Sequence, residues 1–145
     1  MSRCGSCAIA AFVAMSMSAC GSSSITAPRI ERAISPTFAN LVRVQMTWLE
    51  LPPLAAADFA VQANCRRVAA GDRAGSGEWT CTLTWKGLNR KIVRDSYELF
   101  VTADGCYTAT ASGEAIGGPM LKTESGRDVR NLLYEFEGCF DTTGG

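Results

Sequence analysis

The spacing of hydrophobic residues changes once along the chain, from a period of three to four residues to a period of two. Between residues 37 and 51, before two consecutive prolines, apolar side chains recur at helical spacing, namely Phe38, Leu41, Val42, Met46, Trp48 and Leu49. Ser35 and Pro36 precede them as an N-cap and a proline suited to the first helical position. Arg43 and Gln45 fall on other faces. The pattern predicts one amphipathic helix that begins at Ser35 and runs to the end of this segment.

Beyond residue 60 the apolar positions alternate with polar ones, which is typical of strands with one buried face. The expected inward positions are Val61, Ala63 and Cys65, then Trp79, Cys81, Leu83 and Trp85, then Tyr97, Leu99 and Val101. Asp104-Gly105 predicts a two-residue hairpin turn that returns the chain through residues 106–110. A last apolar stretch covers residues 132–136. These elements predict an α+β fold in which an N-terminal helix packs on an antiparallel meander sheet of four to five strands.

The order of a leading helix and an antiparallel meander resembles the cystatin-like arrangement of small actinobacterial envelope lipoproteins. The resemblance lies in the order of the elements alone. A single-layer sheet with one covering helix is the natural way for the sheet and the helix each to bury one face. We expect one domain over residues 35–142.

The first two dozen residues have the features of a secretory signal. Arg3 is followed by an apolar stretch from Cys7 to Ala19, which is too short for a membrane-spanning helix. The run Met17-Ser18-Ala19-Cys20 resembles the lipobox of bacterial lipoproteins, with methionine where leucine is usual. The resemblance implies that residues 1–19 are a signal peptide, that the Cys20 thiol carries a lipid, and that residues 20–34 form a tether. The protein would then be anchored at the extracytoplasmic face of the cell membrane. The alternative is an ordinary secretory signal cleaved near Ala19.

The seven cysteines resolve into three groups on this interpretation. Cys4 and Cys7 leave with the signal peptide, Cys20 is lipidated, and four remain: Cys65, Cys81, Cys106 and Cys139. An even number in an oxidising compartment predicts two disulfides, with three possible connectivities. We favour Cys65–Cys81 and Cys106–Cys139, because each pair joins neighbouring segments of the pattern. None of these four cysteines belongs to a Cys-x-x-Cys pair, so a metal site is not expected.

The formal net charge of zero conceals an uneven distribution. Residues 20–94 contain ten basic and five acidic residues, whereas residues 95–145 contain three basic and nine acidic ones. The residues Arg66, Arg67, Arg90 and Lys91 could form a basic rim that contacts anionic lipid or polymer beside the anchor. The favoured alternative is that basic and acidic strands pair across the sheet. Zero net charge argues against a nucleic-acid partner.

The chain contains no histidine. This excludes every Ser-His-Asp or Cys-His catalytic mechanism, and it excludes every zinc site that needs an imidazole. Neither Gly-x-Ser-x-Gly nor Ser-x-x-Lys occurs, and the spacing of Glu135 and Glu137 is more typical of a solvated strand face than of a catalytic pair. Trp79 and Trp85 are expected in the core rather than in a ligand pocket. We therefore expect no catalytic residue and no cofactor. The sequence favours a non-catalytic envelope lipoprotein that binds or stabilises a partner protein. The alternative is a carrier of a small molecule or lipid on the concave face of the sheet.

Overall fold

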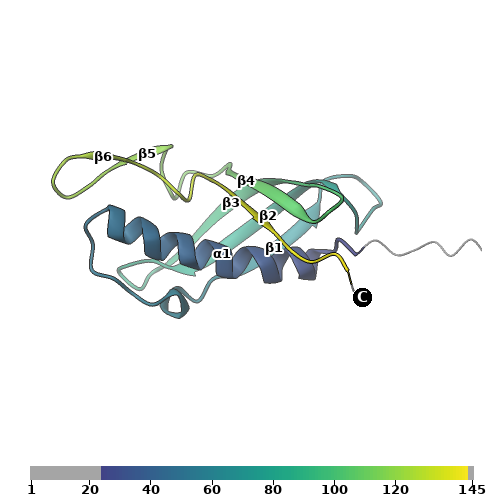
Figure 1. Ribbon diagram of the computed structural model, residues 1–145, viewed down its shortest axis with the longest axis horizontal. Helices are drawn as coiled ribbons and strands as arrows, with labels where there is room; N and C mark the ends of the chain where they lie inside the picture. The colour runs from purple at the N-terminus through teal and green to yellow at the C-terminus, as the bar shows by residue number, and fades with distance from the viewer. Residues whose placement is uncertain (1–23, 144–145) are drawn as a thin grey trace, which may run out of the picture.

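The computed structural model describes residues 24–143, which form one α-helix, one short 3₁₀ turn and seven strands (Figure 1). The elements are α1 Ala27–Trp48, η1 Ala56–Phe59, β1 Gln62–Arg67, β2 Gly77–Lys86, β3 Ile92–Val101, β4 Cys106–Ala111, β5 Met120–Lys122, β6 Asp128–Arg130 and β7 Glu135–Cys139. The α+β prediction is confirmed, since one helix packs against an antiparallel sheet of five strands.

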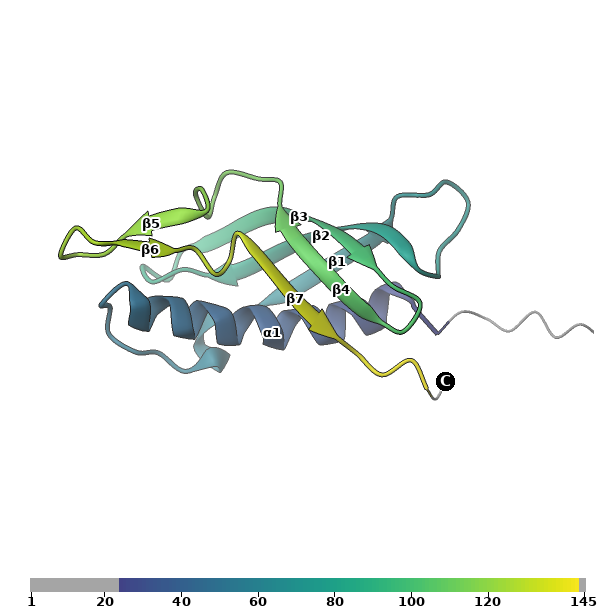
Figure 2. The ribbon, with the colours of Figure 1, turned by 45° about the horizontal axis from the view of Figure 1, so that its top comes forward.

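The five-stranded sheet has the order β1-β2-β3-β4-β7, and each neighbouring pair is antiparallel. The meander is interrupted only between β4 and β7, where β5 and β6 form a separate two-stranded ribbon. The ribbon extends beyond the end of the main sheet (Figure 2). Each of its strands has three residues, which is too short for an alternating pattern to stand out in the sequence.

Helix α1 begins at Ala27, nine residues before Pro36, the first helical position that the sequence indicates. Residues 27–34, expected to belong to a tether, are its first two turns. Ile30 and Ile34 continue the buried stripe of the helix, and burying two such side chains contributes about 1.5–3 kcal/mol each. That gain offsets a cost of about 3 kcal/mol for a proline inside a helix. Pro36 faces solvent, where water can satisfy the carbonyl that its missing N–H leaves unpaired.

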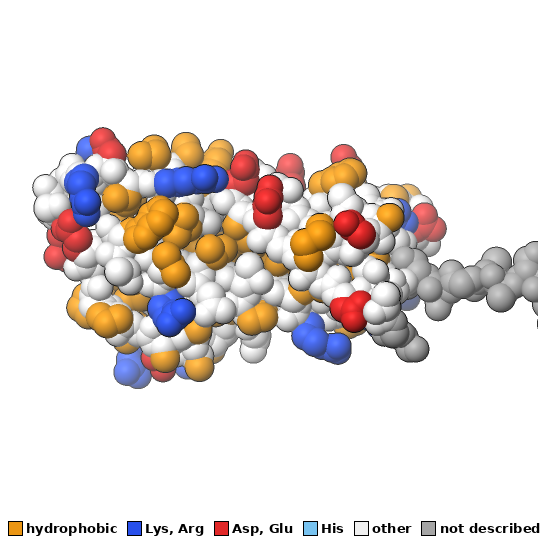
Figure 3. All heavy atoms as spheres, viewed as in Figure 1, with side chains coloured by type: hydrophobic (Ala, Val, Ile, Leu, Met, Phe, Trp, Pro, Cys, Tyr) orange, Lys and Arg blue, Asp and Glu red, His pale blue; other side chains and the backbone are white. Residues whose placement is uncertain are grey.

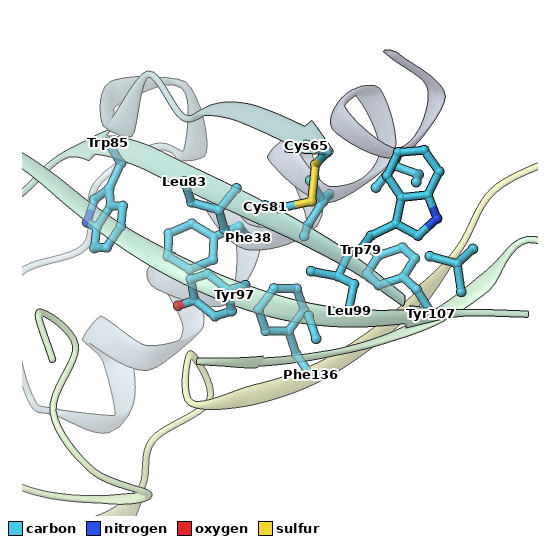
Figure 4. Packing of buried hydrophobic residues seen from close by; sticks show 14 of the residues in the cluster. Phe38, Cys65, Trp79, Cys81, Leu83, Trp85, Tyr97, Leu99, Tyr107 and Phe136 are labelled. Atoms are coloured by element: carbon cyan, nitrogen blue, oxygen red, sulfur yellow. A yellow bond between two sulfur atoms is a disulfide. The ribbon is translucent and has the colours of Figure 1, made fainter. Parts of the chain in front are cut away.

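The core lies between α1 and the inward face of the sheet, and Phe38 is at its centre. The Phe38 side chain is 0% exposed, and its ring lies 4.9 Å from Trp85, 5.8 Å from Tyr97 and 6.0 Å from Phe136, measured between centroids (Figure 4). Trp79 and Trp85 are both buried, as expected from their alternation along β2. The helix therefore fills the inward face of the sheet with aromatic packing.

Both predicted disulfides are present, and each joins directly opposite residues of adjacent strands. Cys65 on β1 faces Cys81 on β2 with 4.1 Å between their Cα atoms, and Cys106 on β4 faces Cys139 on β7 with 3.9 Å. The first bridge lies in the core (Figure 4), whereas the second lies on the outward face and Cys139 is exposed. The two disulfides therefore lie on opposite faces of the sheet.

The hairpin between β3 and β4 forms at Asp104-Gly105, but its loop is longer than the predicted two residues. Residues 102–105 separate the strands, the Gly105 N–H donates to the Thr102 carbonyl at 3.0 Å, and Gly105 has φ 84°. The Thr102 hydroxyl also donates to the Asp104 carboxylate, which lowers the pKa of Asp104. Glycine is needed here because an L side chain rarely adopts this positive φ.

Candidate functional site

The two ends of the described chain lie at one end of the molecule (Figures 1 and 2). The start of α1 is tied to the loop between β1 and β2, where the Gly75 N–H donates to the Ile25 carbonyl at 2.8 Å. At the same end, the Phe140 N–H donates to the Gly105 carbonyl at 3.1 Å. The opposite end is formed by the last turns of α1, the turn between β2 and β3, and the β5–β6 ribbon.

An apolar pocket of about 210 Å³ lies at this opposite end. It is lined by Val42, Gln45, Met46, Leu49, Leu51, Phe59, Trp85, Lys86, Gly87, Leu88, Val93, Ala115, Ile116, Leu121, Asn131 and Leu133. We call it the end pocket. Hydrophobic side chains gather on the surface between α1 and the ribbon, in the left half of Figure 3. At this end of the domain the hydrophobic core is therefore open to solvent through an apolar concavity and is not covered by polar side chains.

Gln45 is a buried polar side chain of the end pocket that retains an unused donor. The residue is 3% exposed, and its Oε1 accepts a hydrogen bond from the Leu132 N–H at 2.5 Å. Because that partner is a donor, the atom facing it must be the oxygen, and Nε2 points elsewhere. Among the described residues, Nε2 has no hydrogen-bond partner. A buried amide without a partner is costly, so an acceptor brought into this region would be stabilised.

Gln45 was placed on a polar face of the helix by the sequence, and that interpretation is wrong. It lies three residues after Val42 and seven after Phe38, which puts it on the buried stripe. A single polar residue on an apolar stripe is the signal that could have revealed it. The other pocket residues between 115 and 133 come from a segment in which the sequence predicted only the last strand.

Asn131, by contrast, uses both its amide nitrogen and its amide oxygen in hydrogen bonds to the backbone around the pocket. It is buried, and its Nδ2 donates to the carbonyls of Ile116 and Gly118 at 2.9 and 2.8 Å. Its Oδ1 accepts from the Leu133 N–H at 3.1 Å. The residue therefore fixes the segments on either side of the ribbon and is not free to bind a ligand.

Glu50 ties the ribbon to the end of α1. Its carboxylate accepts from the Ser125 hydroxyl at 3.0 Å, from the Ser125 N–H at 3.3 Å and from Arg127 Nη2 at 2.9 Å. The hydroxyl of Ser125 is the main cause that lowers the pKa of Glu50 below its usual value. Glu50 therefore remains ionised at neutral pH and holds in position the ribbon that supplies Leu121 to the pocket.

The four basic residues singled out in the sequence are not brought together. Arg66 pairs in register with Thr80 near the start of β2, whereas Arg90 and Lys91 lie in the turn after Lys86. The strand between positions 80 and 86 spans about 20 Å. Arg66 and the turn residues are therefore at opposite ends of the sheet, and they do not form a continuous rim.

Arg67 has a structural role in the loop between β1 and β2. Its guanidinium donates to the Asp72 carboxylate at 3.0 Å and to the carbonyls of Ala74 and Ser76 at 2.8 and 2.5 Å. These contacts occupy the group and leave its side chain 17% exposed. Of the four residues, Arg66, Arg90 and Lys91 are the ones exposed to solvent.

Ion pairs across the main sheet, which the sequence favoured, do not form among residues 24–143. The three ion pairs of this part of the chain are Arg67–Asp72, Lys122–Asp128 and Arg127–Glu50. Lys122–Asp128 crosses the small ribbon, and the other two involve loops. Most charged side chains of the large sheet therefore face solvent, whereas Asp95 is buried and Arg67 is largely covered.

A second cavity adjoins the end pocket at the turn between β2 and β3. It has a volume of about 630 Å³ and is lined by Leu54, Ala57, Asp58, Phe59, Lys86, Gly87, Leu88 and Arg90. Phe59, Lys86, Gly87 and Leu88 line both cavities. The turn is thus the boundary between an apolar concavity and a polar one.

The acidic and phenolic groups of the fold have ordinary structural environments. Glu135 and Glu137 are exposed, and buried Asp95 accepts hydrogen bonds from the N–H groups of Ser96 and Ile116. Burial raises the pKa of Tyr97 far above its usual value, and its hydroxyl donates to the Leu133 carbonyl at 2.9 Å. Within residues 24–143, cysteine and carboxylate side chains nowhere gather in a group of three that could hold a metal ion.

The lipidation residue predicted from the sequence, Cys20, lies outside the residues that the structure describes. In the described part of the chain, no helix is both long and apolar enough to cross a membrane. Comparison of the chain with protein-family models, with curated proteins and with solved structures finds no match.

Proposed function

We propose that this protein is a non-catalytic, lipid-anchored module of the cell envelope that binds a partner protein through the end pocket. The observation that carries the proposal is the position and nature of that pocket. It is an apolar concavity of about 210 Å³ at the end of the domain opposite to the start of α1. Open apolar concavities on small domains are favoured sites for an anchoring side chain of a partner.

The size of the pocket favours a partner side chain over a complete small ligand. Sites for small molecules commonly measure about 300–1,000 Å³, whereas a cavity of about 150 Å³ holds one benzene ring. The end pocket falls between these values and is close to the lower one. One aromatic or branched aliphatic side chain would fill most of it.

The anchor is supported by the sequence around Cys20 and by the short distance to the fold. Ile25 is already buried in the core, so only the four residues 21–24 separate the lipidated cysteine from the domain. That length of chain spans at most about 18 Å. Helix α1 then carries the fold about 33 Å further to the end pocket.

A carrier of a small apolar molecule is the second candidate, and Gln45 is the observation that favours it. Its unpartnered Nε2 could donate to a single acceptor on an otherwise apolar ligand. Such a ligand would occupy the end pocket and not the middle of the concave face, because α1 and its aromatic contacts fill that face.

The anchor is tested by acyl labelling in cells. Wild-type protein is expected to incorporate a labelled fatty acid and to fractionate with membranes, because the lipid is attached to the Cys20 thiol. Cys20→Ser should lose the label and appear in the soluble extracytoplasmic fraction. Cys7→Ser, within the signal peptide, is the matched control and should keep both properties. Unlabelled wild-type protein would contradict the lipoprotein assignment.

Partner binding is tested with a photo-crosslinking amino acid at Met120, which is exposed beside the pocket residue Leu121. The crosslinked product should disappear when Ala115→Trp is added, because Ala115 is an exposed residue of the pocket lining and an indole there would fill the pocket. Ala103→Trp, in the exposed loop at the opposite end, is the matched control and should leave the product unchanged.

The outcomes separate the two candidate functions. A protein adduct that Ala115→Trp abolishes and Ala103→Trp retains supports partner binding. A small molecule that co-purifies with wild type and is lost in Ala115→Trp would instead support the carrier. Adducts that both variants form equally would show that the end pocket is not the site.

A further inference from the structure

The turn between β2 and β3 concentrates positive charge and exposed apolar surface in one short segment. Lys86, Arg90, Lys91 and Arg94 are exposed, and no acidic residue occurs between positions 86 and 94. In the same segment, Leu88 is 52% exposed and Ile92 is 65% exposed. We call residues 86–94 the hairpin tip.

The backbone of the hairpin tip is closed by hydrogen bonds, which fix the conformation of the turn. The Gly87 N–H donates to the Lys91 carbonyl at 2.8 Å, and the Arg90 N–H donates to the Gly87 carbonyl at 2.9 Å. Lys86 pairs in register with Ile92, which places an ammonium group and an aliphatic side chain side by side on the outward face. Arg94 lies on this same face, two residues beyond Ile92.

The cations of the hairpin tip are available to an external anion. None of the four forms an ion pair with any residue from 24 to 143, where the ion pairs involve other residues. The lining of the adjoining cavity contains one acidic residue, Asp58, whose carboxylate accepts a hydrogen bond from the Ala55 N–H at 2.9 Å. The charge of the tip is therefore not neutralised within the fold.

We propose that the hairpin tip docks on the surface of an anionic lipid bilayer, with Leu88 and Ile92 entering the boundary between headgroups and acyl chains. The four cations would contact lipid phosphates and anionic headgroups. The two aliphatic side chains select a bilayer over a soluble polyanion, because only a bilayer offers hydrocarbon beneath a layer of negative charge.

This contact does not depend on the lipid anchor, which belongs to the opposite end of the domain. If both operate, the domain lies along the membrane, held by Cys20 at one end and by the hairpin tip at the other. The end pocket, which shares Lys86, Gly87, Leu88 and Val93 with the tip, would then open close to the lipid surface.

The test uses the chain from residue 20 with Cys20→Ser, so that no acyl chain contributes. This chain retains the whole fold, because the core and both disulfides lie between Ile25 and Phe140. Binding is measured by co-sedimentation with vesicles of phosphatidylcholine and phosphatidylglycerol at 3:1, and with vesicles of phosphatidylcholine alone, in 0.1 M salt. We expect binding to the anionic vesicles and none to the neutral ones.

Two variants of the tip separate its charged and apolar contributions. Arg90→Ser/Lys91→Ser should weaken the partition coefficient about 25-fold, at about fivefold for each lost cation. Leu88→Ser/Ile92→Ser should weaken it at least about tenfold while leaving its dependence on salt unchanged, because the charges remain. Both pairs are exposed, so the fold should be retained, which far-UV circular dichroism verifies.

The matched control is Arg66→Ser/Arg73→Ser, which removes two exposed cations from the other end of the sheet. It should bind the anionic vesicles as tightly as the parent chain. If this control weakened binding as much as Arg90→Ser/Lys91→Ser, the net charge of the domain would account for the binding, and the proposal would be overturned. Wild-type affinity in Leu88→Ser/Ile92→Ser would overturn insertion and point to a soluble polyanion. Absence of binding to the anionic vesicles would also overturn the proposal.

Discussion

Phe38→Ala is expected to lower the free energy of unfolding by about 3–5 kcal/mol, the usual range for removing a fully buried phenylalanine. The Phe38 ring is 0% exposed and contacts rings from three strands, namely Trp85, Tyr97 and Phe136. Because the hydrogen bonds of the sheet fix the positions of those strands, the three rings cannot move far enough to fill the cavity that the substitution leaves. Chemical denaturation monitored by circular dichroism measures the change.

Val44→Ala is the matched control on the same helix. Val44 is exposed, so its truncation should change the free energy of unfolding by less than about 0.5 kcal/mol. Similar losses in the two variants would mean that the packing of α1 on the sheet contributes little to stability, and that the core has been assigned to the wrong face of the helix.

The double replacement Cys65→Ala/Cys81→Ala should destabilise the protein by about 4–5 kcal/mol. The sequence separation of 16 predicts about 3 kcal/mol from the loop entropy regained by the unfolded chain. The rest comes from two buried sulfurs, each comparable to a methylene group of about 0.8 kcal/mol. Thermal and chemical denaturation under non-reducing conditions would measure the loss.

Cys106→Ala/Cys139→Ala is the natural comparison, because the disulfide that it removes closes a longer loop and lies on the other face of the sheet. Its separation of 33 predicts about 3.7 kcal/mol from loop entropy. Little burial is lost, since Cys139 is exposed and Cys106 only partly buried. The core bridge should therefore be the more costly one to remove despite its shorter loop. The reverse order would show that loop length alone determines the effect.

The two proposals on function use adjacent surfaces at the same end of the domain. The end pocket is bounded by α1, the ribbon and the turn between β2 and β3, and that turn is also the hairpin tip. Docking of the tip would bring the pocket to the level of the lipid headgroups. A partner that inserts an apolar side chain would then itself be expected to lie at the membrane surface.

Local patterns predicted the strands well because each strand is half buried. Trp79, Cys81 and Leu83 alternate with threonines, and only one side of the sheet is covered by α1. The disulfides followed from the same pattern, since a meander places consecutive strands side by side. The start of the helix was mispredicted because Ser35-Pro36 is a strong local signal for a helix N-terminus. The helix begins earlier because Ile30 and Ile34 gain stability by being buried against the sheet, and this gain outweighs the local signal.

The amino-acid sequence by itself determined the α+β class, the strands of the main meander and the absence of histidine chemistry, and it favoured one of the three possible pairings of the four cysteines. These follow from periodicity, composition and neighbouring position along the chain. The tertiary structure alone decided which charges lie together, since Arg66 and Arg90 depend on strand register for their separation. It also decided that Gln45 is buried and that residues as far apart in the chain as Val42 and Leu133 line one pocket. Contacts of that kind depend on how the helix and ribbon are placed against the sheet, and no local pattern encodes that placement.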